Sequence, residues 1–166
     1  MSKAFTDEEA CDEAPIVRPR PPLPAGVPNY VTRAGLAALR AELESLQTER
    51  SRLSALPNEK ERGRALGALA ARRAALEDRI ATAELAPPPE SPNEIRFGAT
   101  VRVSGPDGER RYEIVGVDEA DPARGKIAFT SPLARSLLGR SAGDSVKLAT
   151  PRGRDEVEIV AVSYRE

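Results

Sequence analysis

The residue types in this chain restrict the chemistry that it could perform. Histidine is absent and cysteine occurs once, as Cys11, which excludes a histidine-based metal site, a catalytic triad and an internal disulfide. We interpret Cys11 as an inert, exposed thiol. Glu59 and Glu61, which flank a lysine, are considered as candidates for chemistry because the apolar pattern described below places them at the tip of a hairpin. The simpler interpretation of the same stretch is a polar turn with two solvated acids.

These two acids lie between two runs of apolar residues that have helical spacing. Residues recur at steps of three and four in a first run (Leu36, Leu39, Leu43, Leu46, Leu53, with Arg50 in the gap) and in a second (Leu66, Leu69, Leu76, Ile80, Ala83, with Arg73 in the gap). Such spacing forms one apolar stripe along a helix. The runs mirror each other, since 36 pairs with 83, 39 with 80, 43 with 76, 46 with 73, 50 with 69 and 53 with 66. We predict an antiparallel helical hairpin, a coiled coil, over residues 30–86. Its fold-back lies near residues 59–60, and its tip is Asn58-Glu59-Lys60-Glu61.

Cap and breaker residues predict where the two helices begin and end. Thr32 is suited to the N-cap of the first helix, and Pro87–Pro89 stop the second helix after residues 85–86. Gly35 is a mild defect in the first turn. Gly63 and Gly67 each weaken the start of the second helix by about 1 kcal/mol relative to alanine. We therefore expect the half of the hairpin near the tip to fray more readily than the base.

Two segments have the composition of unstructured chain. Residues 1–29 contain acids at 7–9 and 12–13 followed by many prolines, and they offer too little apolar surface to bury. We predict a disordered or extended tail over residues 1–29, in which the acidic cluster is solvated or docks weakly on a partner. Residues 87–94 are predicted to be a linker.

Composition also bounds the partners of the chain. The net charge of −1 gives no general attraction for nucleic acid, so a protein partner is expected. No apolar run approaches the ~20 residues that a membrane span needs, and acids stand where a signal peptide would be apolar. We expect a cytoplasmic protein. It should be a monomer, because the mirrored pairing leaves few apolar residues of the stripe exposed.

From residue 95 the apolar pattern changes to the period of two that strands show. Alternating segments at 100–103, 112–117, 126–129, 145–148 and 157–164 are separated by turns such as Pro106-Asp107-Gly108. Ser131 and Pro132 are suited to begin a short helix over residues 133–138. We predict an α+β fold, in which the hairpin is followed by a small antiparallel sheet with one short helix over residues 95–166.

Taken in order, several of these segments resemble the bacterial Gre transcript-cleavage factors. Tyr30-Val31-Thr32-Arg33-x-Gly35 resembles the opening of their coiled coil. Phe97-Gly98-Ala99-x-Val101 and Tyr112-x-Ile114-Val115-Gly116-x-Asp118-Glu119 resemble the first two strands of their globular domain. Ser131-Pro132-Leu133-Ala134-Arg135, followed by Gly143-Asp144, resembles its helix and flanks. The resemblance covers residues 30–166.

The resemblance implies an FKBP-like C-terminal domain and an elongation regulator that binds RNA polymerase. In the family this domain docks at the rim of the secondary channel, and the coiled coil enters it with indirect contact to nascent RNA and DNA. Two acids at the tip, here Glu59 and Glu61, would help to hold the second Mg²⁺ of the polymerase, which hydrolyses backtracked RNA. The factor would have no cofactor of its own and would not be an enzyme by itself. Docking would involve Ser131, Pro132, Ala134, Arg135 and Asp144, several of which could equally serve as local caps and turns.

The sequence departs from the family at the tip. The family's Gly-Asp-x-x-Glu-Asn string is absent, and the first arm is shorter by roughly one heptad. One variant of the hypothesis is a factor that stimulates cleavage through the two glutamates. The other is an inhibitor or initiation regulator that occupies the channel without stimulating cleavage. Arg50 and Arg73 either contact acids of the channel or extend over the leucines opposite.

Two hypotheses come from other classes of protein. One is a coiled-coil interaction adapter that self-associates through exposed leucines. The other, on fold analogy alone, is a peptidyl-prolyl isomerase. Aromatic residues make up only 4% of the chain, which disfavours a proline-binding pocket.

Overall fold

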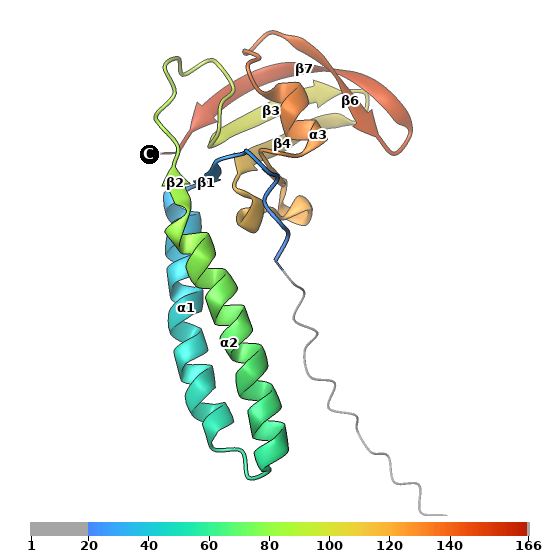
Figure 1. The fold of residues 1–166 in the computed structure, drawn as a ribbon. Coiled ribbons are helices and arrows are strands. Elements are labelled where there is room, and N and C mark those ends of the chain that lie inside the picture. The colour runs from blue at the N-terminus through green and yellow to red at the C-terminus, as the bar shows by residue number, and fades with distance from the viewer. Residues whose placement is uncertain (1–19, 166) are drawn as a thin grey trace, which may run out of the picture.

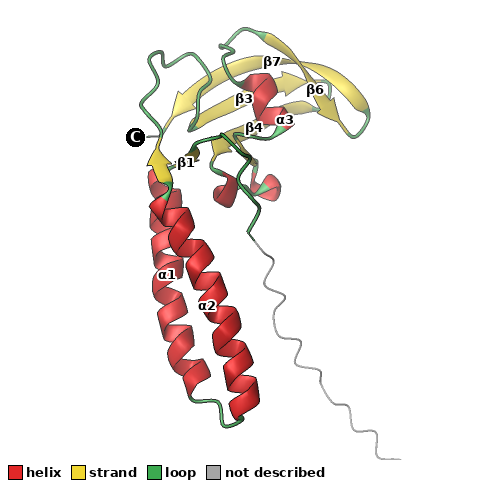
Figure 2. Cartoon of the chain, in the orientation of Figure 1, coloured by secondary structure: helices red, strands yellow, loops and turns green. Residues whose placement is uncertain are grey.

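A helical hairpin projects from a curled β-sheet in the computed structural model, which describes residues 20–165 (Figure 1). The hairpin consists of α1 (Arg33–Ser54) and α2 (Glu59–Ala81), with the short strands β1 (Asn29–Val31) and β2 (Ala83–Leu85) at its base. Figure 2 shows the long helices in the projecting half of the molecule and most strands in the other half. Cys11 and the acidic cluster of the predicted tail lie outside the described residues.

The turn between the two helices lies earlier than the mirrored pattern predicted. Residues 55–58 connect α1 to α2, so the predicted fold-back at residues 59–60 is wrong. The reason is a cap: the Asn58 side chain accepts a hydrogen bond from the backbone N–H of Glu61 at 3.0 Å and thereby starts α2. Glu59, Lys60 and Glu61 consequently form the first helical turn and not the loop. At the base, Thr32 caps α1 as predicted, because its hydroxyl accepts the N–H of Gly35 at 2.9 Å.

The second helix ends at Ala81, earlier than residues 85–86, where the sequence predicted its end. Asn29 explains the difference, since its side-chain amide donates to the carbonyl oxygen of Arg79 at 2.9 Å and to the hydroxyl of Thr82 at 3.2 Å. The chain then continues as β2, which pairs in parallel with β1. Asn29 was placed in the predicted tail but lies buried in β1. Strands this short carry too little alternation to be detected in a sequence.

Five strands form the larger sheet, in the order β5-β4-β3-β7-β6. They are β3 (Ala99–Gly105), β4 (Gly108–Val115), β5 (Lys126–Ala128), β6 (Ser145–Thr150) and β7 (Gly153–Tyr164). The predicted strands are all present and the sheet is mostly antiparallel as predicted, but the pair β4 and β5 is parallel. Parallel neighbours need a crossover. Here it contains the short 3₁₀ turns η1 (Val117–Glu119) and η2 (Pro122–Arg124).

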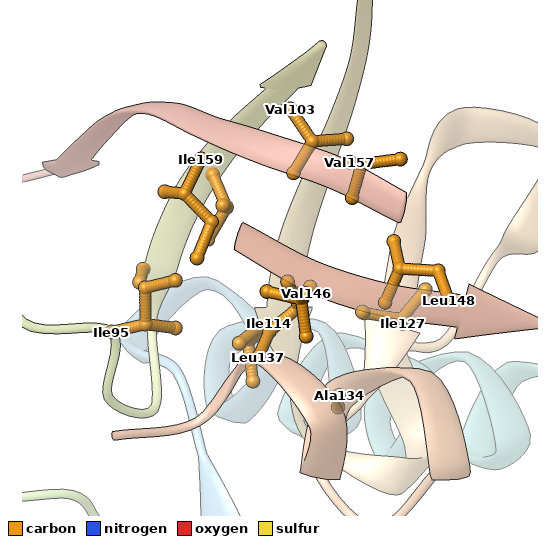
Figure 3. Close-up of a cluster of buried hydrophobic side chains, with 12 residues drawn as sticks. Ile95, Val103, Ile114, Ile127, Ala134, Leu137, Val146, Leu148, Val157 and Ile159 are labelled. Atoms are coloured by element: carbon orange, nitrogen blue, oxygen red, sulfur yellow. The ribbon is translucent and has the colours of Figure 1, made fainter. Parts of the chain in front are cut away.

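Two separate apolar cores stabilise the two halves of the molecule. In the sheet domain, α3 (Pro132–Leu137) begins at the predicted Ser131 cap and packs against β5 and β6. Its core, drawn in Figure 3, includes Ile95, Val101, Ile114, Leu137 and Ile159, each fully buried. The hairpin core is smaller and consists of Val31, Leu39, Leu46, Leu69 and Leu76. No helix among the described residues combines the length and the apolar character needed to cross a membrane.

Candidate functional site

The two candidate acids lie exposed at the free end of the hairpin. Glu59 and Glu61 occupy the first turn of α2, where the positive end of the helix dipole favours acidic side chains. Residues two apart on an α-helix are rotated by about 200° around its axis and do not face each other. The two carboxylates therefore leave the helix on different sides, which does not fit a pair that shares one metal ion.

The surroundings of these acids are basic. Residues 50–64 carry five cations (Arg50, Arg52, Lys60, Arg62, Arg64) and two anions (Glu59, Glu61), a local balance of +3. Within residues 20–165 no three acidic or cysteine side chains gather in a group that could hold a metal ion. Arg62 stabilises the turn by donating to the carbonyl oxygen of Leu56 at 2.8 Å. The tip is thus a capped, basic end of a hairpin, and the metal-assisting role of its two acids stays a prediction.

The predicted docking residues lie on α3 and before β6, two elements that pack together. Pro132 and Arg135 are exposed. Ser131 serves as the cap of α3, accepting the N–H of Ala134 at 3.2 Å, and Asp144 accepts the N–H of Ser141 at 2.8 Å. Ala134 is 0% exposed, so its side chain packs in the core, and its part in docking stays a prediction.

The two arginines that interrupt the apolar stripe are not buried between the helices as its central leucines are. Arg50 is exposed, and Arg73 forms an ion pair with Glu77, one turn later, at 2.8 Å. The buried arginine of the hairpin is Arg79, near the end of α2, which the sequence pattern did not single out. Its place in the sequence gives no signal of burial, because its partners Pro21 and Asp118 are distant in the chain.

Glu119 of η1 joins the sheet domain to the start of α1. Its carboxylate accepts the N–H of Thr32 at 3.0 Å, the hydroxyl of Thr32, and the N–H of Gly116 at 3.2 Å. A Cβ at Gly35 would overlap this carboxylate. Gly35 is therefore required for the close approach of η1, although within the sequence it reads as a helix defect. The motif residue Gly35 thus lies against Glu119, which is far from it in the chain, and Gly116 donates to the same carboxylate.

A second set of contacts, the base cluster, consists of Arg20, Glu42, Arg79 and Asp118. Arg20 forms ion pairs with Glu42 of α1 and, at 3.0 Å, with Asp118 of η1. Arg79 lies 3.4 Å from Asp118, and the side chains of these two residues are only 9% and 5% exposed. Burial acts to lower the pKa of Arg20, but hydrogen bonds and charges from Glu42 and Asp118 outweigh it and raise the pKa. The cluster joins both helices to the sheet domain.

Three aromatic rings complete the junction. Tyr30 of β1 lies 5.7 Å from both Phe97 and Phe129 of the sheet domain, measured between ring centroids, and the two phenylalanines are 5.5 Å apart. These rings and Pro87–Pro89 line a groove of about 380 Å³. Three of the six aromatic residues of the chain thus lie together at the junction, which composition alone did not reveal.

Together these features define a protein of two parts, in which a hairpin with a free tip is fixed at its base to a sheet domain. The family model described as "Transcription elongation factor, GreA/GreB, C-term" matches residues 89–164. Transcription elongation factor GreB of Neisseria meningitidis serogroup B is 38% identical over 153 residues, covering 82% of this chain and 94% of the relative. Transcription elongation factor GreA of Hyphomonas neptunium is 36% identical over 152 residues, covering 81% and 97%.

The chain therefore belongs to the GreA/GreB family. A solved structure of the prokaryotic transcription elongation factor GreA/GreB from Nitrosomonas europaea is 26% identical and covers 81% of this chain and 98% of its own. Its TM-score of 0.42 is too low to add to the assignment.

Proposed function

We propose that this protein is a transcription elongation factor that binds RNA polymerase at its secondary channel. The observation that carries the proposal is family membership that extends over both parts, since the match to the Neisseria relative covers 94% of that protein. The sheet domain docks at the rim of the channel, and the hairpin enters it. The factor has no catalytic site of its own and acts on the polymerase in the cytoplasm.

The shape of the hairpin supports insertion into a partner. With 22 residues, α1 is about 33 Å long, and Figure 1 shows its far end beside α2, projecting away from the sheet domain. The apolar stripe is closed between the helices, since the exposed large apolar residues among those described are Leu85 and Val160, neither of them in the stripe. This disfavours the self-associating adapter, and we propose a monomer, which light scattering would verify.

Binding to core RNA polymerase tests the proposal directly. The protein, labelled at Cys11, should bind core polymerase with micromolar or tighter affinity, measured by fluorescence anisotropy. Exposed Arg135 on α3 is the docking residue to change, and Arg135→Ala should weaken binding by about tenfold if it lies in the interface. Arg124→Ala, which removes an equally exposed arginine of the same domain, is the matched control. Absence of binding at about 10 μM polymerase would refute the proposal.

The geometry of the tip supports the variant in which the factor occupies the channel without stimulating RNA cleavage. The glutamates do not fit joint coordination of Mg²⁺, since they leave α2 on different sides and lie among basic residues. We therefore assign the hairpin the role of occupying the channel and modulating elongation or pausing. It does not stimulate RNA cleavage by a mechanism that needs both acids. Lys60, Arg62 and Arg64 face a channel environment in which acidic groups and phosphates are complementary partners.

A further inference from the structure

Residues 20–28, here called the strap, cross the base of the hairpin before β1 begins. They precede residue 30, where the resemblance to the family begins. Despite their proline-rich composition, they contact three other elements. Arg20 reaches Glu42 of α1 and Asp118 of η1, and the carbonyl oxygen of Pro21 accepts a hydrogen bond from Arg79 of α2.

Distances within the base cluster indicate that Arg20 is its central member. The ion pair between Arg79 and Asp118 is 3.4 Å long, and Glu42 also lies 3.5 Å from Arg72, which is outside the cluster. Arg20 approaches Asp118 to 3.0 Å and also donates a hydrogen bond to Glu42. One planar guanidinium can donate to two carboxylates at once, which the single ammonium of lysine does less well. Arg20 thus connects an acid of the hairpin to an acid of the sheet domain.

The position of this connection along α1 gives it a mechanical consequence. Glu119 contacts the helix at Gly35, and Arg20 contacts it at Glu42, about 10 Å further along the axis at 1.5 Å per residue. A helix attached at one point can pivot about that point. A second attachment one to two turns away blocks this motion and fixes the direction of the helix.

We propose that the strap is a brace that sets the direction in which the hairpin projects from the sheet domain, with Arg20 as its positioning residue. The brace acts through the hairpin and touches neither the tip nor the docking surface on α3. A sequence segment outside the resemblance to the family thereby controls where the tip points.

Distance measurements on the free protein test the brace. With Cys11 replaced by serine, spin labels at Ala55→Cys in the turn and Lys147→Cys on β6, both exposed positions, report the spread of tip positions. Arg20→Ala should make this distance distribution about twofold wider, because α1 loses one of its two attachments, while the pair of Arg79 with Asp118 still holds α2. Glu42→Gln tests the same contact from α1 and should widen it in the same direction. Arg124→Ala is the control and should leave the width unchanged.

Salt separates an ionic brace from simple packing. In about 1 M NaCl, where the Debye length is about 3 Å, the wild-type distribution should widen toward that of Arg20→Ala, and the variant should change little. Unchanged widths in both Arg20→Ala and Glu42→Gln, with circular dichroism equal to wild type, would overturn the brace.

The effect on the polymerase rests on the proposed function and is measured separately. Arg20→Ala should keep its affinity for core polymerase within about twofold, because α3 is untouched, while its effect on elongation rate falls by about threefold or more. An effect on elongation equal to wild type would show that the brace does not position the tip. Failure of wild type to bind polymerase would refute the proposed function and leave the distance measurement valid.

Discussion

The base and the tip of the hairpin are built from the same two helices but differ in how their polar groups are used. At the base, Thr32, Arg79 and Asn29 each bond to a residue distant in the sequence. At the tip, Asn58 and Arg62 bond only within the turn, and both glutamates are left exposed. The base is therefore specified by the rest of the protein, whereas the tip is available to a partner.

The glycines of the hairpin show the same difference. Gly35 is buried against Glu119, and a side chain there would displace the carboxylate. Gly63 and Gly67, near the tip, have no atom within 4 Å of where a Cβ would lie. Helix propensity alone treats all three as equal defects. The comparison shows that only the first is required by a tertiary contact.

Leucine-to-alanine substitutions should give the largest difference in lost stability between the base and the tip of the hairpin. Leu76, near the base, is 0% exposed, and Leu76→Ala should destabilise the hairpin by about 3 kcal/mol, because it leaves a cavity in a closed core. Leu53, beside the turn, is only half-buried, and Leu53→Ala should cost about 1 kcal/mol. Urea unfolding followed by circular dichroism measures both values. Equal costs would contradict the distinction between base and tip.

Glycine-to-alanine substitutions should change the stability by less, with a loss at the base and a gain near the tip. Gly35→Ala gains helix propensity but breaks charge-assisted hydrogen bonds of Glu119, for a net loss of about 1 kcal/mol. Gly63→Ala gains about 1 kcal/mol with no opposing clash. The same urea experiment compares the two variants. A stabilised Gly35→Ala would mean that η1 moves aside without cost, and the role assigned to Glu119 would then be wrong.

Local patterns predicted the parts of the fold that depend on neighbouring residues. The leucine spacing indicated both helices, the alternation indicated the five strands, and the Thr32 and Ser131 caps begin the helices as expected. The mirrored pairing located the turn wrongly, because the Asn58 cap decides where α2 begins.

The features that the sequence missed depend on long-range contacts. Glu119 meets Thr32 across 87 positions, and Arg20 meets Asp118 across 98. No period or spacing records such a meeting, so the base cluster, the β1–β2 pair and the burial of Arg79 were not predicted. Gly35 carried the one usable signal, since a glycine in the first turn of a helix is costly without a tertiary reason.

For the two acids of the tip, the residue types and their placement in the structure lead to different conclusions. The mirrored apolar pattern placed Glu59 and Glu61 at the tip, and the resemblance to the family implied that they approach a metal ion. Their placement in one helical turn, two positions apart, determines that they face different sides. The resemblance supplied a role for a pair of acids, and the capped first turn of α2 does not hold them as a pair.

Cleavage of RNA in stalled elongation complexes tests the central claim, that the tip occupies the channel without cooperation of its two acids. Wild type should bind the complexes and change elongation, while cleavage stays within about twofold of the polymerase alone, and Glu59→Ala and Glu61→Ala should behave as wild type. Gln47→Ala, at an exposed and uncharged position of α1, is the matched control. Stimulated cleavage that falls about tenfold or more in both glutamate variants, but not in Gln47→Ala, would contradict the account.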